Sequence, residues 1–250
     1  MTDKSLSSLG RMLSVLDLFS DQQLTWTAEG ITEALQLSLP TGYRYVKMLV
    51  DAGLLQRAAN SQYTLGPRII VLDHYIRMAD PVLKYGVPFM AELVEKTGFD
   101  CVISGLYGQQ VLDTHRELGK APATLSYGRG RPRPLFQGAA PKVILSCFTP
   151  AQLHRVFDLH GDEIANVGLP MDWNNFRKYY SAIRKAGYYF SNGELEPNLA
   201  ALAAPMQKED GTILGAISLV TTVQRMAVID LPKLTTLVTR AAQEITARII

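Results

Sequence analysis

The chain has 250 residues, of which 47% are hydrophobic and 19% are charged, and its formal net charge is +2. This is the composition of an ordinary globular protein with room for one or two domains, and it excludes an intrinsically disordered chain. The net charge is too small to indicate a polyanionic partner by itself. The two cysteines, Cys101 and Cys147, form no CxxC pair, so neither a zinc site nor a disulfide framework is expected.

Two kinds of segment are not found in the sequence. There is no apolar run of about 18 or more residues and no signal-peptide pattern. We therefore expect a soluble, cytoplasmic protein that does not contact a membrane.

The chain is predicted to begin with two short helices. Residues 8–21 place apolar side chains at helical spacing, and Ser7 or Ser8 is available as the N-cap. The apolar stripe of this first helix consists of Leu9, Leu13, Leu16 and Phe19, with Met12 and Val15 beside it. Residues 28–36 predict the second helix, with Thr27 as its N-cap.

A third helix is predicted directly after the second. Ser38 is placed to cap it, Pro40 falls in its first turn, and Gly53 is suited to end it. Residues 54–66 then have the pattern of a short hairpin. Three helices followed by a hairpin predict a winged helix-turn-helix, which would bind DNA. The alternative is a small helical subdomain that packs against another part of the protein.

The third helix has two different faces in the prediction. The face expected to be buried carries Leu39, Tyr43, Val46 and Val50, with Leu49 at its edge. The face expected to point outward carries Thr41, Arg44, Tyr45, Lys47 and Met48. A face this rich in hydrogen-bonding groups suits the major groove, where a recognition helix reads base edges.

Each polar residue of this segment has an expected role in DNA binding. Arg44 can form a bidentate contact with guanine or bind a phosphate, whereas Lys47 is expected to bind a phosphate. Gly42 would allow close approach to the DNA, and Arg57 would reach it from the wing. The full set expected to contact DNA is Thr27, Ser38, Thr41, Gly42, Arg44, Tyr45, Lys47 and Arg57.

The charge of the first 75 residues limits how tightly one copy can bind DNA. We count six Lys or Arg residues against seven Asp or Glu residues, which is a net charge of about −1. Phosphate neutralisation supplies much of the free energy of DNA binding. We therefore expect binding to require a dimer on a palindromic site.

The rest of the chain predicts a linker helix and a second domain. Residues 67–80 form an apolar helix that ends before Pro81. Residues 81–250 then alternate between helices and strands, with two strands joined by a turn at Tyr107 and Gly108. Further predicted elements are helices starting at Pro141, Pro150, Asp172 and Asp230, and strands around residues 199–206 and 212–220. The fold class is therefore α+β in two domains: a winged helix-turn-helix at 1–66, a linker helix at 67–80, and a domain at 81–250 with a central antiparallel sheet flanked by helices.

Several motifs identify a family that the chain resembles along nearly its full length. The first domain contains "SSLGRMLSVLDLFS", "LSLPTGYRYVKMLVDAGLL" and "YTLGPRI", and the second contains "RPLFQGAAPKVILS" and "GYYFSNGELEPNLAALAAPMQKEDGTILGAISLV". These motifs are similar to those of the IclR-type bacterial transcriptional regulators. The resemblance implies a homodimer or tetramer whose second domain binds a small effector, often an organic acid or an aromatic catabolite.

The resemblance also implies where that effector binds. In related proteins its carboxylate lies near a helix N-terminus, which matches Gly138, Ala139 and Ala140 in this chain. Free N–H groups and the helix dipole at such a start suit an anion. The effector-binding residues that follow from the resemblance are Ala139, Ala140, Ser191, Ala201, Ser218 and Val220.

This chain departs from the family pattern at several of these places. Phe136 stands where relatives usually carry a histidine, and Pro141, which lacks an N–H, stands where many have a glycine. Ser191, Ala201 and Val220 replace more polar or acidic residues of some relatives. These departures predict a more apolar pocket that favours a larger ligand, such as an aromatic acid, over a very small keto acid.

Other candidate chemistry is less favoured. Cys147 precedes two histidines, but it lies in an apolar helix where an inert buried thiol is expected. Asp113, His115 and Glu117 alternate along one strand and lack further metal ligands, so they predict a solvated or interface face. The stretch "YGRGRPRP" lacks the context of a phosphate-binding loop and is expected at a pocket rim or a subunit contact.

Two functions remain open on the sequence alone. The first is a ligand-responsive regulator that binds operator DNA, without cofactor or metal and without enzymatic activity. The alternative is a small-molecule-binding protein or an enzyme on the second domain, with a non-functional DNA-binding head.

Overall fold

The computed structural model describes residues 7–249 and divides the chain into two compact units between Asp80 and Pro81. Each unit has hydrophobic clusters of its own. Within the described residues, no helix is both long and apolar enough to cross a membrane.

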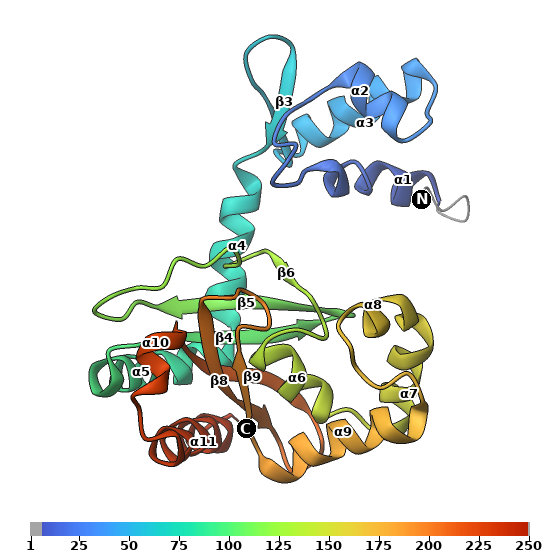
Figure 1. Cartoon of the computed structure of the whole chain (residues 1–250). Coiled ribbons are helices and arrows are strands. Elements are labelled where there is room, and N and C mark those ends of the chain that lie inside the picture. Colours follow the sequence, from blue (N-terminus) through green and yellow to red (C-terminus); the bar gives the residue numbers. More distant parts are fainter. Residues whose placement is uncertain (1–6, 250) are drawn as a thin grey trace. The chain divides into compact units, whose positions relative to one another are not determined.

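The first unit is a helix-turn-helix with a small sheet (Figure 1). Its elements are α1 (Ser8–Leu13), the 3₁₀ helix η1 (Leu16–Leu18), β1 (Trp26–Thr27), α2 (Ala28–Ala34), α3 (Leu39–Asp51), β2 (Leu55–Arg57), β3 (Gln62–Leu65) and α4 (Arg68–Ala79). The three strands pair antiparallel in the order β1-β3-β2. The hairpin of β2 and β3 is the predicted wing, and α4 is the predicted linker helix.

Local capping rules explain where the helices of this unit begin. Ser7 caps α1 by accepting a hydrogen bond from the Gly10 N–H, and Thr27 caps α2 by accepting one from the Gly30 N–H. Both caps were predicted and are confirmed. Ser38 occupies the cap position of α3, but its side chain accepts no capping hydrogen bond.

The first predicted helix is wrong in its length and only partly right in its buried stripe, because Leu16 and Phe19 pack against the core of this unit. The helix ends at Leu13, and a separate 3₁₀ turn follows. Val15 is fully buried, whereas Leu9 and Leu13 are 64% and 51% exposed. The break changes the phase of the apolar residues, so the two leucines at its start lie outside the core.

The predicted faces of α3 are also partly wrong. Its buried residues are Gly42, Tyr45, Val46 and Leu49, while Leu39 and Tyr43 are exposed. The helix is rotated toward Gly42 because α2 packs there. A Cβ built on Gly42 would lie 2.0 Å from Thr32 Oγ1 of α2, so only glycine permits this close approach.

The second unit is built on a six-stranded antiparallel sheet with the order β6-β5-β4-β9-β8-β7. Its strands are β4 (Asp100–Tyr107), β5 (Gln110–Glu117), β6 (Pro132–Arg133), β7 (Tyr189–Asn192), β8 (Leu199–Gln207) and β9 (Ile213–Thr222). Its helices are α5 (Pro81–Thr97), α6 (Ala139–Ser146), α7 (Pro150–Leu159), α8 (Gly161–Asn166), α9 (Trp173–Ala186), α10 (Val223–Ala227) and α11 (Leu231–Ala247). The predicted α+β fold class is confirmed.

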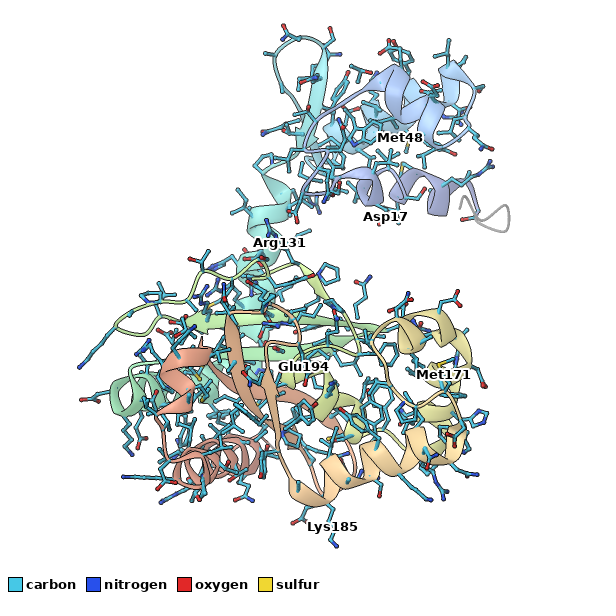
Figure 2. The ribbon with its side chains drawn as sticks, in the orientation of Figure 1. Asp17, Met48, Arg131, Met171, Lys185 and Glu194 are labelled. Atoms are coloured by element: carbon cyan, nitrogen blue, oxygen red, sulfur yellow. The ribbon has the colours of Figure 1, made fainter. Side chains whose placement is uncertain are left out.

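Helices cover both faces of this sheet (Figure 1). One hydrophobic cluster lies between one face of the sheet and helices α5, α10 and α11. A second lies between the other face and helices α6, α7, α8 and α9. Lys185, near the end of α9, points away from the unit (Figure 2). Successive side chains of β8 and β9 point to opposite faces of the sheet, so these strands contribute to both hydrophobic clusters. The pocket described below lies on the face that α6 covers.

The sequence predicts most elements of this unit but not all of them. Thr149 and Asp172 cap α7 and α9 as predicted, and Gly187 ends α9 with φ of 74°. The prediction missed α8, α10, β6 and β7, which are short and carry little periodicity. It also placed the start of α6 at Pro141, two residues after the helix begins at Ala139.

Candidate functional site

The exposed face of α3 is the first candidate site. Arg44 and Lys47 are exposed on this helix, and Thr41 is half-buried in its first turn. The hydroxyl groups of Ser38 and Thr41 lie 2.9 Å apart and share a hydrogen bond. The Arg44 guanidinium lies 5.7 Å from the centre of the Tyr45 ring, which supports it from the protein side.

Two of the residues expected to touch DNA point the other way. Tyr45 is 4% exposed, and Gly42 is buried against Thr32 of α2. The prediction that Tyr45 lies on the outward face is therefore wrong, and Gly42 permits the close approach of α2 rather than the expected approach of DNA. Both residues pack inside the helix-turn-helix and support α3 from behind.

Tyr43 takes an outward position that the sequence did not predict. It is 46% exposed, and its hydroxyl donates a hydrogen bond to the Glu29 carboxylate. This hydrogen bond raises the pKa of Tyr43 and lowers the pKa of Glu29. It ties the outward surface of α3 to α2.

The last two residues expected to contact DNA are Thr27 and Arg57. Thr27 is half-buried, and its Oγ1 accepts the Gly30 N–H at 3.0 Å, which accounts for its role as a cap. Arg57 is exposed on β2, and its guanidinium lies 6.0 Å from the centre of the Tyr63 ring. Arg57 therefore extends from the wing with its charge available to a partner.

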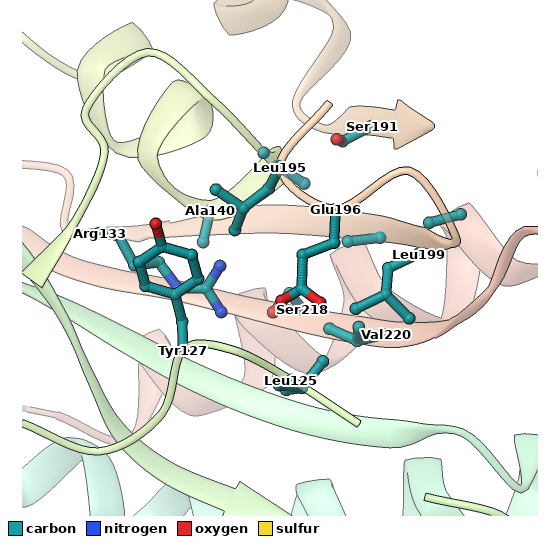
Figure 3. A pocket seen from close by; sticks show the side chains of 14 residues that line it. Leu125, Tyr127, Arg133, Ala140, Ser191, Leu195, Glu196, Leu199, Ser218 and Val220 are labelled. Carbon is teal, nitrogen blue, oxygen red and sulfur yellow. The ribbon is translucent and has the colours of Figure 1, made fainter. Parts of the chain in front are cut away.

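The second candidate site is a pocket between the start of α6, the sheet and two connecting loops (Figure 3). Including its opening to solvent, the space between the lining atoms is about 460 Å³. Its lining residues are Leu125, Tyr127, Arg133, Gly138, Ala139, Ala140, Ser191, Leu195, Glu196, Leu199, Ala200, Ala201, Ser218 and Val220. All six predicted effector residues are among them, although they come from four separate elements.

Strand pairing explains why the sheet residues converge. Ser191 of β7 is opposite Ala201 of β8, and Ala201 is opposite Val220 of β9. Ser218 lies two residues before Val220, on the same face of β9. A single patch of small side chains therefore forms the floor of the pocket.

The start of α6 differs from the prediction in one respect. The Gly138 N–H donates to Glu194 Oε2 at 3.2 Å, so this group is not free for a ligand. Lys142 donates to the same oxygen at 2.6 Å, and the Tyr189 hydroxyl donates to Glu194 Oε1 at 2.7 Å. The protein's own carboxylate thus occupies part of the anion-binding end of α6. Among the contacts of residues 7–249, the N–H groups of Ala139 and Ala140 have no protein acceptor, so they remain for a ligand.

The prediction of an apolar pocket is incomplete. Phe136 is 2% exposed and packs against Phe176 and His160, so it does not line the pocket. Two charged side chains, Arg133 and Glu196, do line it. The expected position of "YGRGRPRP" at a pocket rim is confirmed by Tyr127 and Arg133, but nothing in the sequence predicted Glu196.

The structure also shows the surroundings of the two cysteines and of Asp113, which were weighed above as nucleophiles and as a metal ligand. Burial raises the pKa of both cysteine thiols, that of Cys147 to about 11, which makes them poor nucleophiles. Asp113 is buried and bound to Arg133, so the expected solvated strand face is wrong at this residue. Within residues 7–249, no group of three or more His, Cys, Asp or Glu side chains is arranged to hold a metal ion.

Both units match known families. Residues 8–59 match the IclR helix-turn-helix domain, and residues 75–247 match the family described as bacterial transcriptional regulator IclR C-terminal. The chain is 23% identical to the HTH-type transcriptional regulator XynR of Escherichia coli over 223 residues, which is 88% of each chain. It is 28% identical to the HTH-type transcriptional regulator KipR of Bacillus subtilis over 211 residues, which is 83% of each chain.

Solved structures have the same fold. An IclR homolog from Microbacterium hydrocarbonoxydans, crystallised with 4-hydroxybenzoate, matches with a TM-score of 0.79 and 21% identity, over 97% of this chain and 99% of that one. The Thermotoga maritima IclR matches with a TM-score of 0.71 and 16% identity, over 97% and 98% of the two chains. The matched residues extend through both units, and the chain belongs to the IclR family of bacterial transcriptional regulators.

Proposed function

We propose that this protein is a cytoplasmic, ligand-responsive regulator that binds operator DNA as a homodimer or tetramer and senses a small organic acid. The favoured effector is an aromatic acid, and the regulated genes would belong to a catabolic pathway. The observation that carries the proposal is the pocket at the start of α6, around which all six expected effector residues gather. This arrangement suits a sensor, and we assign it no catalytic step.

The DNA-binding part of the proposal rests on the outward face of α3. Arg44 would read a base edge or bind a phosphate, Lys47 would bind a phosphate, and Thr41 would lie near the groove at the helix start. Arg57 would contact the backbone or the minor groove from the wing. Because the first 75 residues have a net charge of about −1, the grip of one copy would be modest.

Exposed apolar side chains support assembly with a second copy. No residue of α4 is buried within its own unit, and Ile70 and Met78 are 74% and 71% exposed. Leu9 and Leu13 of α1 are exposed as well. Monomeric proteins rarely expose large contiguous apolar patches, and α4 exposes several large apolar side chains within 12 residues. A self-complementary contact between two copies would bury them.

The pocket lining supports a ring-containing ligand. Leu125, Leu195, Leu199 and Val220 provide apolar surface, and the α6 start provides N–H groups for a carboxylate. The related protein from Microbacterium hydrocarbonoxydans has 4-hydroxybenzoate bound. An aromatic acid matches both properties of the pocket.

Binding to DNA is tested by fluorescence anisotropy with the promoter beside the chain's own gene. We expect Arg44→Ala to weaken binding by about 1–3 kcal/mol, and Lys47→Ala to reduce the slope of log K against log salt by about 1. Arg240→Ala is the matched control because Arg240 is exposed on α11, outside the proposed interface. Equal binding by Arg44→Ala and the control would remove Arg44 from the reading face.

Effector binding is tested separately by calorimetry on the full chain. We expect benzoate or 4-hydroxybenzoate to bind more tightly than glyoxylate or pyruvate. Tight binding of either keto acid without binding of the benzoates would contradict the proposed aromatic effector.

A further inference from the structure

Two side chains of opposite charge face each other in the pocket. Figure 3 shows the guanidinium of Arg133, from β6, and the carboxylate of Glu196, from the β7–β8 connection, both pointing into it. Among the residues that the structure describes, no ion pair joins these two groups. The space between them is therefore available to a ligand that satisfies both.

Arg133 is held rigidly and keeps donors to spare. Its Nε and Nη2 donate to the two carboxylate oxygens of Asp113 at 2.7 and 2.8 Å. Asp113 is 3% exposed and also accepts the Ser104 hydroxyl at 2.7 Å. A guanidinium has five N–H groups, and Nη1 has no protein acceptor among the described contacts. A ligand carboxylate fits this remaining edge with the bidentate geometry that arginine favours.

Glu196 has the opposite requirement. Its Oε1 accepts the Ser126 N–H at 2.8 Å, and no protein donor reaches Oε2 among the described contacts. Leu199 and Val220 lie beside this carboxylate in the pocket and offer it nothing polar, and the Ser218 hydroxyl donates to the Val102 carbonyl. A ligand that displaces water here must donate a hydrogen bond to Glu196, because a desolvated carboxylate without a donor is costly.

The charges of the pocket strengthen this requirement. Asp113 already neutralises Arg133, and Glu196 adds one further negative charge. A second carboxylate on the ligand would lie near Glu196 and be repelled. An unsubstituted acid would satisfy Arg133 but leave Oε2 of Glu196 without a donor.

We propose that Arg133 and Glu196 together select acids that carry a carboxylate at one end and a hydrogen-bond donor, a hydroxyl or an ammonium group, at the other. This inference rests on the proposed function, in which this pocket binds the effector. It narrows the effector from organic acids in general to hydroxy- or amino-substituted acids and excludes dicarboxylates.

The test is calorimetric titration of the full chain with a matched series of ring acids. The series consists of benzoate, 3-hydroxybenzoate, 3-(aminomethyl)benzoate, 3-methoxybenzoate and isophthalate. We expect the hydroxy and aminomethyl acids to bind about tenfold more tightly than benzoate, a difference typical of one hydrogen bond to a charged group. The methoxy acid has no donor and should bind no better than benzoate, and isophthalate should bind most weakly.

Variants assign the preference to the two residues. Glu196→Gln should remove most of the advantage of the aminomethyl acid and improve isophthalate binding, with benzoate affinity nearly unchanged. The Asp113→Asn, Arg133→Met double variant keeps the buried site neutral and should weaken every acid at least tenfold. Glu209→Gln, at an exposed position in the β8–β9 turn, is the control and should match the wild type. Circular dichroism and melting temperature confirm that each variant is folded.

The outcomes separate this inference from the proposed function. If the acids bind but hydroxy and methoxy acids are equal, or if Glu196→Gln leaves the order unchanged, the selection by Glu196 is refuted. If the double variant binds all the acids normally, the role of Arg133 is refuted. If no acid of the series binds the wild-type protein, the proposed aromatic-acid sensor fails and this inference fails with it.

Discussion

Because α2 and α3 approach closely at Gly42, we expect Gly42→Ala to destabilise the protein, whereas helix propensity alone would predict stabilisation. A Cβ at position 42 would lie 2.0 Å from Thr32 Oγ1 and 3.0 Å from Thr32 Cβ, with Thr32 Cγ2 at 3.2 Å. Rotation of Thr32 cannot relieve the overlap, because all three atoms are close and the side chain is β-branched. The Thr32 hydroxyl is also engaged, since it donates to the Ala28 carbonyl at 2.7 Å.

The expected magnitude follows from two opposing effects. Replacing a mid-helix glycine with alanine usually stabilises a helix by about 1 kcal/mol. Overpacking a buried contact costs about 1–3 kcal/mol. We therefore expect Gly42→Ala to destabilise the first unit by about 1 kcal/mol. In a Thr32→Ala background, where only the Cβ at 3.0 Å remains, the same substitution should be neutral or stabilising by about 0.5 kcal/mol.

The assay is urea denaturation of the four members of this double-mutant cycle. The chain has two tryptophans, and a Trp173→Phe background leaves Trp26 of β1 as the reporter of the first unit. A coupling free energy of at least about 1 kcal/mol between positions 32 and 42 is expected. If Gly42→Ala stabilises the protein equally in both backgrounds, the packing explanation for Gly42 is wrong.

Three further predictions concern the second unit. Thr149→Ala should lower the free energy of unfolding, measured by urea denaturation, by about 1 kcal/mol, whereas Thr149→Ser should lower it little. The reason is that Thr149 and Gln152 form a reciprocal capping box at the start of α7. Equal losses in the two variants would contradict this explanation. Gly215→Ala should lower the free energy of unfolding by at least about 2 kcal/mol, and the melting temperature with it. Gly215 has φ of +134°, and a Cβ there would lie 2.2 Å from the Ser104 carbonyl oxygen. An unchanged melting temperature would refute the strain. Burial raises the pKa of Cys147 from 9.0 to about 11, so the contribution of the neutral thiol is complete below pH 9 and is lost as the pH rises toward 11. Urea midpoints of the wild type should therefore fall more than those of Cys147→Ala between pH 8 and pH 10.5, and parallel curves would show that the thiol is not buried.

The helix boundaries show where sequence reasoning succeeds. Ser7, Thr27, Thr149 and Asp172 accept backbone N–H groups at the predicted helix starts, and Gly187 adopts the left-handed conformation at the predicted end of α9. These features depend on a few neighbouring residues. The short elements β6 and α8 were missed because two to six residues carry no readable period.

Helix α3 shows where sequence reasoning is limited. Its amphipathic character was correctly predicted, but its orientation was not, and Tyr45 and Tyr43 exchanged their expected environments. Either orientation gives an apolar stripe on this helix. The packing of α2 determines the orientation of α3, because Thr32 of α2 can pack closely only against Gly42.

The lining of the pocket was predicted only in part from the sequence. Motif resemblance predicted six lining residues, because the motifs at the start of α6 and on the sheet floor align this chain with the family position by position. It did not predict that Glu194 would occupy the Gly138 N–H, or that Arg133 and Glu196 would meet in the same space. By itself, the sequence determined the capped helices, the wing, the α+β class and the family, because these follow from local rules and motifs. Only the tertiary structure decided which face of α3 is buried and which charges face the pocket, because these depend on side chains brought together from distant parts of the chain.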